Sequence, residues 1–117
     1  MSYSELFRCS DGQIIAEKAF FARTLFSRLQ GMIGRKFAAS PFDAMVFERC
    51  NSVHCCWMSE AIDVLFIDTD MEVVRVFSRL KPWKFACGGR KAATTVELPA
   101  GTIEKYNITA GDMLKWK

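Results

Sequence analysis

The hexapeptide IDVLFI, residues 62–67, decides the fold, because it predicts a strand that is buried on both faces. A half-exposed strand alternates polar and apolar side chains, whereas this one is apolar at every position except Asp63. An unpaired carboxylate inside such a strand is costly. We therefore expect Asp63 to be paired with a cation, hydrogen-bonded or exposed in a pocket.

Shorter runs with a period of two lie on both sides of this central strand and predict further strands. An Asp-Gly turn at 11–12 joins two such runs near the N-terminus and is typical of a hairpin. The other runs are AMVFE at 44–48, VVRVF at 73–77, TTVEL at 94–98 and MLKWK at 113–117. We expect a single mainly-β domain, a compact β-sandwich or squat barrel of seven to eight short strands.

One amphipathic helix is predicted to pack on this sheet, between Thr24 as N-cap and Gly34 just beyond its end. Its apolar side chains fall within an arc of about 120°, at about 100° per residue. These side chains are Leu25, Phe26, Leu29, Met32 and Ile33. Arg28 lies at the edge of the arc, so we predict that it reaches under the helix and pairs with Asp63.

The composition is that of an ordinary globular protein. The 117 residues allow one domain, 1–117, with half of the residues hydrophobic and a quarter charged. No secretory signal is visible, and no apolar run is long enough to span a membrane. Five cysteines without a signal predict reduced thiols and a cytoplasmic location. The net charge of +3 does not demand a nucleic-acid partner.

The order of motifs resembles a family of small prokaryotic domains, domain of unknown function 192. The resemblance runs from about Ala22 to Leu114. The motifs that carry it are RTLFSRLQGMIGR, CNSVHCCWMSEAIDVLFID, VVRVF, VELPAGTIEKYNI and AGDML. The resemblance implies a compact mainly-β fold of the sandwich type and brings no established reaction, ligand or catalytic residue. Many relatives carry a signal or lipid anchor, and this chain departs from them in showing none.

A sulfur-rich stretch precedes the central strand and offers a candidate metal site. Cys50, His54, Cys56 and Met58 share one face of an extended chain, and they are the soft ligands that suit copper(I) or zinc. Side chains two residues apart stand about 6.6 Å apart along a strand, so a tetrahedral site needs further ligands from elsewhere. We favour core packing for this face and expect no cofactor.

Two other hypotheses use His54. A thiol enzyme would need His54, a cross-strand cysteine and Asp63, yet nothing in the sequence places an oxyanion hole. A ligand pocket formed by Arg28, His54, Asp63 and Glu97 would instead fix a small molecule or a protein partner through its charged groups. We favour this non-enzymatic binding domain, and for the Arg28–Asp63 pair itself we favour a structural clamp.

The last candidate is the basic segment 79–91, in which five cations and two aromatic residues resemble a loop that binds single-stranded nucleic acid. Its candidate contacts are Lys81, Trp83, Lys84, Arg90 and Lys91. A solvated loop is the competing interpretation and the one we favour. We expect at most weak, nonspecific nucleic-acid binding.

Overall fold

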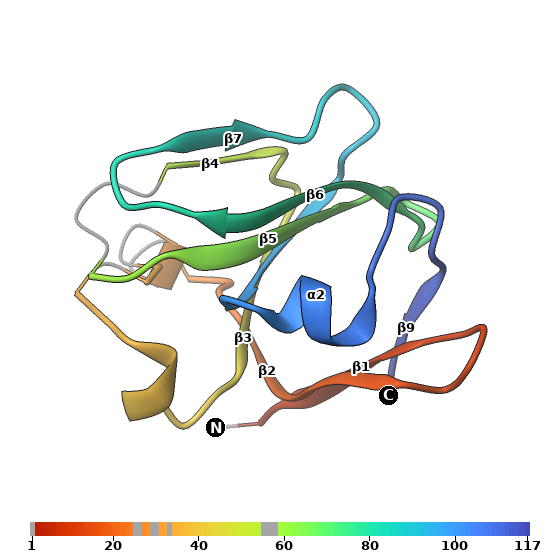
Figure 1. Cartoon of the computed structure of the whole chain (residues 1–117), viewed down its shortest axis with the longest axis horizontal. Coiled ribbons are helices and arrows are strands. Elements are labelled where there is room, and N and C mark those ends of the chain that lie inside the picture. The colour runs from red at the N-terminus through yellow and green to blue at the C-terminus, as the bar shows by residue number, and fades with distance from the viewer. Residues whose placement is uncertain (1, 25–26, 29–30, 33, 55–58) are drawn as a thin grey trace.

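The computed structural model describes residues 2–24, 27–28, 31–32, 34–54 and 59–117. Strands dominate this part of the chain (Figure 1). The strands are β1 (Ser4–Arg8), β2 (Ile14–Phe21), β3 (Ala44–Glu48), β4 (Ser52–His54), β5 (Ile62–Ile67), β6 (Val73–Leu80), β7 (Phe85–Cys87), β8 (Thr94–Pro99) and β9 (Leu114–Trp116). A 3-10 helix, η1 (Phe37–Ala39), and a short helix, α2 (Thr102–Tyr106), accompany them. The prediction of a mainly-β fold is confirmed.

Seven strands form one curled sheet in the order β6-β5-β8-β3-β2-β1-β9, and β4 pairs with β7 in a separate two-stranded sheet. The β2–β3 pair is parallel, while the other described pairs are antiparallel. The two edges of the large sheet meet at one end, where Glu72 and Met113 form a bridge. The amide of Leu114 also donates to the carbonyl of Met71 at 2.9 Å. The sheet is therefore a squat, partly open barrel (Figure 1).

The buried side chains form two apolar clusters, one on each face of this sheet. Leu65 and Leu98 belong to the inner cluster, which all the strands of the curled sheet and α2 contribute to. Val64 and Met45 belong to the outer cluster, to which the β4–β7 pair also contributes. Met32, Phe37 and Phe42 complete this side of the core. All six residues of β5 are buried, as the central-strand prediction required.

The predicted amphipathic helix lies only partly within the described residues. Ser27 and Arg28 are helical, and the Thr24 hydroxyl accepts a hydrogen bond from the Ser27 amide at 3.0 Å, as an N-cap does. Met32 is only 2% exposed, and Gly34 has a φ of 68°. Four other residues of the predicted apolar arc, Leu25, Phe26, Leu29 and Ile33, lie outside the described part. No described helix is long and apolar enough to cross a membrane.

Candidate functional site

The carboxylate of Asp63 is fully buried and is held by two backbone amides. Its Oδ1 accepts a hydrogen bond from the Arg79 amide at 2.8 Å, and its Oδ2 accepts one from the Ile103 amide at 2.8 Å. Ile103 lies in the first turn of α2, so one carboxylate joins β5 to the end of β6 and to that helix. Asp63 thus has a structural contact on both of its oxygens.

The predicted Arg28–Asp63 pair is wrong. Nη1 of Arg28 donates instead to the carbonyl of Glu48, at 2.8 Å. The register explains the difference, because Asp63 stands opposite Leu98 and shares the inner face with it. Two amides already satisfy the carboxylate on that face. The prediction that Asp63 must be hydrogen-bonded or paired is met without a cation.

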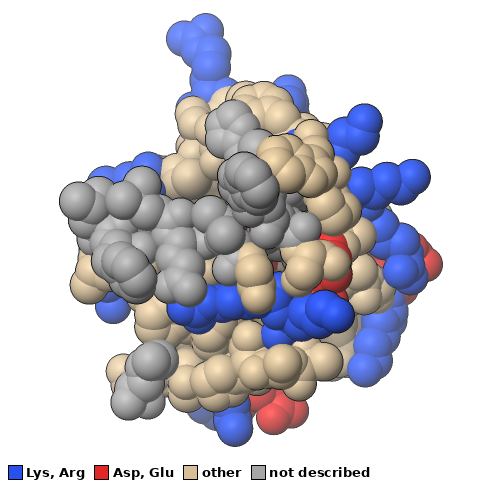
Figure 2. Space-filling model, turned by 90° about the vertical axis from the view of Figure 1, so that its left-hand side faces the viewer, with Lys and Arg blue, Asp and Glu red and all other residues tan. Residues whose placement is uncertain are grey.

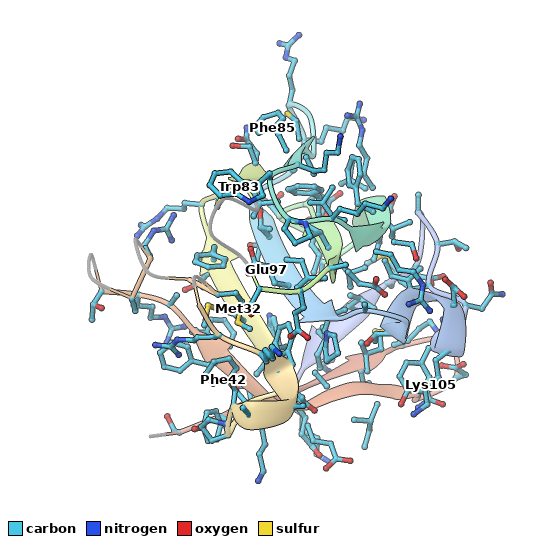
Figure 3. The ribbon with its side chains drawn as sticks, turned by 60° about the vertical axis from the view of Figure 1, so that its left-hand side comes forward. Met32, Phe42, Trp83, Phe85, Glu97 and Lys105 are labelled. Atoms are coloured by element: carbon cyan, nitrogen blue, oxygen red, sulfur yellow. The ribbon has the colours of Figure 1, made fainter. Side chains whose placement is uncertain are left out.

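Glu97 faces the other side of the sheet and is surrounded by apolar side chains. It stands opposite Val64 on β5 and Met45 on β3, both members of the outer cluster, near the middle of the molecule (Figure 3). Only 3% of its surface is exposed, and burial raises the pKa of Glu97 to about 8. Within the described part of the chain, its Oε1 has no hydrogen-bond partner. Asp63 and Glu97 therefore do not line one pocket.

Arg28 does line a pocket, together with residues that the sequence did not single out. The pocket has a volume of about 390 Å³ and is formed by Arg23, Arg28, Glu48 and Arg49. Nε of Arg23 forms an ion pair with Oε1 of Glu48 at 2.9 Å. Across the described residues, Arg28 and Arg49 form no ion pair, so positive charge is in excess here. We call these four residues the arginine pocket.

A second pocket of about 430 Å³ adjoins the arginine pocket and shares Arg23 and Glu48 with it. Its aromatic wall contains Phe21 and Trp116, whose ring centroids are 4.8 Å apart. The guanidinium carbon of Arg23 lies 4.5 Å from the centre of the Phe21 ring. We call this second space the aromatic pocket. The two pockets together offer a cationic end and an aromatic end.

Strand pairing brings these residues together. The parallel strands β2 and β3 end side by side, since Phe21 pairs with Val46, and parallel strands place their carboxyl ends at the same edge. Arg23 lies just after the end of β2. Glu48 is the last residue of β3, and Arg49 follows it directly. The sequence pattern predicted both strands but not their pairing. Without that pairing, the sequence could not show that Arg23 and Arg49 lie beside Arg28.

The predicted metal ligands are only partly described. Cys50 donates from Sγ to the carbonyl of Ser52 at 3.1 Å. His54 ends β4, opposite Phe85 on β7. The side chain of His54 lies outside the described residues, as do Cys56 and Met58. Among the residues that are described, no group of three His, Cys, Asp or Glu could hold a metal ion.

The basic segment 79–91 is divided by β7 and does not form one loop. Lys81 and Lys84 belong to the turn before this strand, whereas Arg90 and Lys91 belong to the turn after it. Trp83 is 60% exposed and Phe85 is 56% exposed. Basic side chains dominate the charged surface of the end of the molecule that Figure 2 shows.

Comparison with known proteins identifies the class of this domain. The model of the family described as "Uncharacterized ACR", domain of unknown function 192, matches residues 7–116. The chain belongs to this family, which confirms the resemblance seen in its motifs.

Archaeal relatives support the assignment. A UPF0127 protein from Pyrococcus furiosus is 38% identical over 111 residues, covering 90% of this chain and 91% of the relative. A UPF0127 protein from Pyrococcus horikoshii is 33% identical over 112 residues, covering 91% of this chain and 89% of the relative.

Two solved structures share the fold. A putative transcription regulator from Sinorhizobium meliloti matches with a TM-score of 0.80 and 23% identity, over 99% of this chain and 96% of that one. A protein of unknown function from Novosphingobium aromaticivorans matches with a TM-score of 0.77 and 17% identity, over 97% and 83% of the two chains. At these identities the likeness concerns the fold alone.

Proposed function

We propose that the protein is a non-enzymatic binding domain that takes a small organic anion in the arginine pocket. The observation that carries this proposal is the convergence of Arg23, Arg28 and Arg49 around a single carboxylate, that of Glu48. Glu48 is already paired with Arg23, so an anion would meet the guanidinium groups of Arg28 and Arg49. Guanidinium groups bind carboxylates and phosphates through two parallel hydrogen bonds.

The contacts of Arg28 favour a binding role. Its Nη1 is fixed by the Glu48 carbonyl, and its guanidinium carbon lies 6.0 Å from the centre of the Phe47 ring. A guanidinium has five N–H donors, so this single hydrogen bond positions the group and leaves donors for a ligand. A positioned cation loses little conformational freedom when an anion binds, which favours affinity.

The expected result is that adenosine monophosphate shifts the amide resonances of Arg23, Arg28 and Arg49 in nuclear magnetic resonance spectra of isotope-labelled protein. Inorganic phosphate, which lacks an aromatic body, should bind more weakly. Replacing Arg28 with methionine should weaken binding of adenosine monophosphate by about tenfold, or about 1.4 kcal/mol, because a charge-assisted hydrogen bond is lost.

The matched control is Lys115→Met, which removes an exposed cation from β9 without touching either pocket. This variant should bind as the wild type does. Equal loss of affinity in both variants would mean that net charge alone attracts the ligand, and the proposal would then fail.

A second candidate function is the binding of single-stranded nucleic acid beside β7. The observation that favours it is the exposure of Trp83 and Phe85, since large aromatic side chains in water are suited to stacking on bases. The residues flanking them, Lys81 and Lys84, are exposed cations that could meet phosphates.

A further inference from the structure

The arginine pocket and the aromatic pocket are two ends of one site, because they share a wall. Arg23 and Glu48 line both pockets and are joined by the 2.9 Å ion pair. Of the two pockets, Arg28 and Arg49 line only the arginine pocket, and Trp116 lines only the aromatic pocket. A ligand that spans both therefore needs an anion at one end, a flat ring at the other, and a group between them that suits the shared wall.

The charge of the arginine pocket favours a phosphate monoester over a carboxylate. Three arginines and one glutamate give this pocket a net charge of +2, and the segment 23–35 contains no acidic residue. A carboxylate brings one negative charge, whereas a phosphate monoester brings about 1.5 to 2 at pH 7. Its three oxygens can also meet two separate guanidinium groups, those of Arg28 and Arg49.

Glu48 places a hydrogen-bond acceptor at the wall between the two pockets. Its side chain is 44% exposed, and Nε of Arg23 donates to one of its two oxygens, Oε1. A carboxylate has about four acceptor positions, so it has the capacity to accept a further hydrogen bond. It repels a second anion but accepts hydrogen bonds from the hydroxyl groups of a ribose. Glu48 therefore favours a sugar as the part of the ligand that joins the phosphate to the ring.

The aromatic pocket suits a flat ring that has polar atoms on its edge. Phe21 and Trp116 pack against the inner cluster, which holds their rings in place. Ordered rings lose little freedom when a ligand binds. The guanidinium of Arg23 lies over the Phe21 ring and adds a flat cation on which a base can stack. Ser2 and Ser4 also line this pocket, and their hydroxyl groups can bond to the nitrogens and carbonyls of a base.

We propose that the ligand is a ribonucleoside monophosphate that spans both pockets. Its phosphate meets Arg28 and Arg49. A ribose hydroxyl donates to Glu48, and the base packs beside Trp116. This inference rests on the proposed function and names the ligand of the same site. The order of phosphate, ribose and base in the ligand matches the order of cationic pocket, shared wall and aromatic pocket in the protein.

The first test leaves the protein unchanged and shortens the ligand. In isothermal titration calorimetry, adenosine monophosphate should bind about tenfold more tightly than ribose phosphate, because ribose phosphate lacks the base that stacks. Dideoxyadenosine monophosphate, which lacks both ribose hydroxyls, should bind about fivefold more weakly than adenosine monophosphate. In nuclear magnetic resonance spectra, adenosine monophosphate should shift the indole N–H resonance of Trp116, and ribose phosphate should not.

Glu48→Met tests the recognition of the sugar. Removing the carboxylate should abolish the preference for adenosine monophosphate over its dideoxy analogue, because the acceptor for the ribose hydroxyl is lost. The same change should strengthen the binding of inorganic phosphate, because a negative charge leaves a cationic pocket. A purely structural role of Glu48 would instead weaken all of these ligands alike.

Trp116→Leu tests the recognition of the base. This variant should bind adenosine monophosphate about tenfold more weakly and should bind ribose phosphate as the wild type does. The matched control is Tyr106→Leu, since Tyr106 also packs against the inner cluster but lines neither pocket. The control should keep the affinity for both ligands. If Trp116→Leu does not fold, the ligand series on the wild type still decides the outcome.

The outcomes separate this inference from the proposed function. No binding of adenosine monophosphate or inorganic phosphate would overturn both. Equal affinity for adenosine monophosphate, ribose phosphate and inorganic phosphate, with shifts at Arg28 and Arg49 only, would keep the anion site and overturn the inference. An unshifted Trp116 indole resonance with bound adenosine monophosphate would place the base elsewhere and overturn it as well. A preference for ribose that survives in Glu48→Met would overturn the role of Glu48.

Discussion

Replacing Glu97 with glutamine is expected to raise the free energy of unfolding by about 3 kcal/mol at pH 7. The carboxyl group faces apolar side chains, and burial raises its pKa to about 8 from its ordinary value of 4.5. At pH 7 the folded protein must hold Glu97 mainly as the neutral acid, whereas the unfolded chain releases the proton. Glutamine is neutral in both states, so this cost disappears.

The same difference in pKa makes the stability of the wild type depend on pH. Between the unfolded pKa of 4.5 and the folded pKa of about 8, the native state binds one proton more than the unfolded state. The stabilisation is complete below pH 4.5 and is lost as the pH rises toward 8, because stability falls where the native state binds more protons. The loss over this window is about 5 kcal/mol, at about 1.4 kcal/mol per pH unit.

Urea denaturation at pH 5, 6, 7 and 8 would measure this dependence, followed by fluorescence or circular dichroism. The matched control is Glu17→Gln, which removes an exposed carboxylate from β2 and should keep the slope of the wild type. A wild-type stability that stays constant from pH 5 to 8 would contradict the prediction. It would indicate that a partner holds Glu97 as the charged carboxylate.

The strands could be predicted because each carries its own pattern of apolar residues. The side of the sheet that each buried carboxylate faces could not be predicted. Asp63 and Glu97 both lie in apolar strands, and the sequence does not say which residue of β8 stands opposite which residue of β5. The observed register pairs Asp63 with Leu98 and Val64 with Glu97. A shift of one residue exchanges the faces of a strand, so the two carboxylates end on opposite sides of the sheet.

The arginine pocket was only partly predictable for a related reason. Arg28 was found because it lies at the edge of a helical apolar arc, which is a local pattern. Arg23 and Arg49 meet it only because β2 and β3 pair in parallel across more than twenty residues of chain. In the adjoining aromatic pocket, Trp116 comes from β9, which reaches this edge by pairing with β1. Contacts set by the pairing of distant strands leave no periodic signal in the sequence.

The basic segment shows how local structure changes the meaning of a composition. Its cations are close in sequence, and a loop would gather them around the two aromatic residues. Three residues, Phe85–Cys87, instead form β7 by pairing with β4. An extended strand separates what a loop would cluster. Four of the five cations become two pairs, with Trp83 beside only one of them, and the fifth, Arg79, belongs to β6.

Replacing Asp63 with alanine is expected to lower the free energy of unfolding by about 4 kcal/mol. The substitution removes the acceptor of two backbone amides, those of Arg79 and Ile103. A buried donor without a partner costs about 1–3 kcal/mol, and hydrogen bonds to a charged acceptor lie at the upper end. Water cannot readily replace the carboxylate, because Asp63 is fully buried in the sheet. Asp63→Asn should cost about half as much, since its amide oxygen can still accept one of the two hydrogen bonds.

Asp68 provides a matched control, because its Oδ1 also accepts two backbone amides, those of Asp70 and Glu72, at the surface. Asp68→Ala should lower the free energy of unfolding by only about 1 kcal/mol, since water can bond to the two amides that lose their acceptor.

A double-mutant cycle of Asp63→Asn with Arg28→Met should be additive, because the structure joins Arg28 to Glu48 and not to Asp63. Urea denaturation with an unchanged m-value would measure all of these differences. Equal losses of stability for Asp63→Ala and Asp68→Ala would show that burial does not determine how much the Asp63 carboxylate stabilises the fold. A coupling energy above about 0.5 kcal/mol in the cycle would instead indicate that Arg28 and Asp63 interact, in contradiction to the structure.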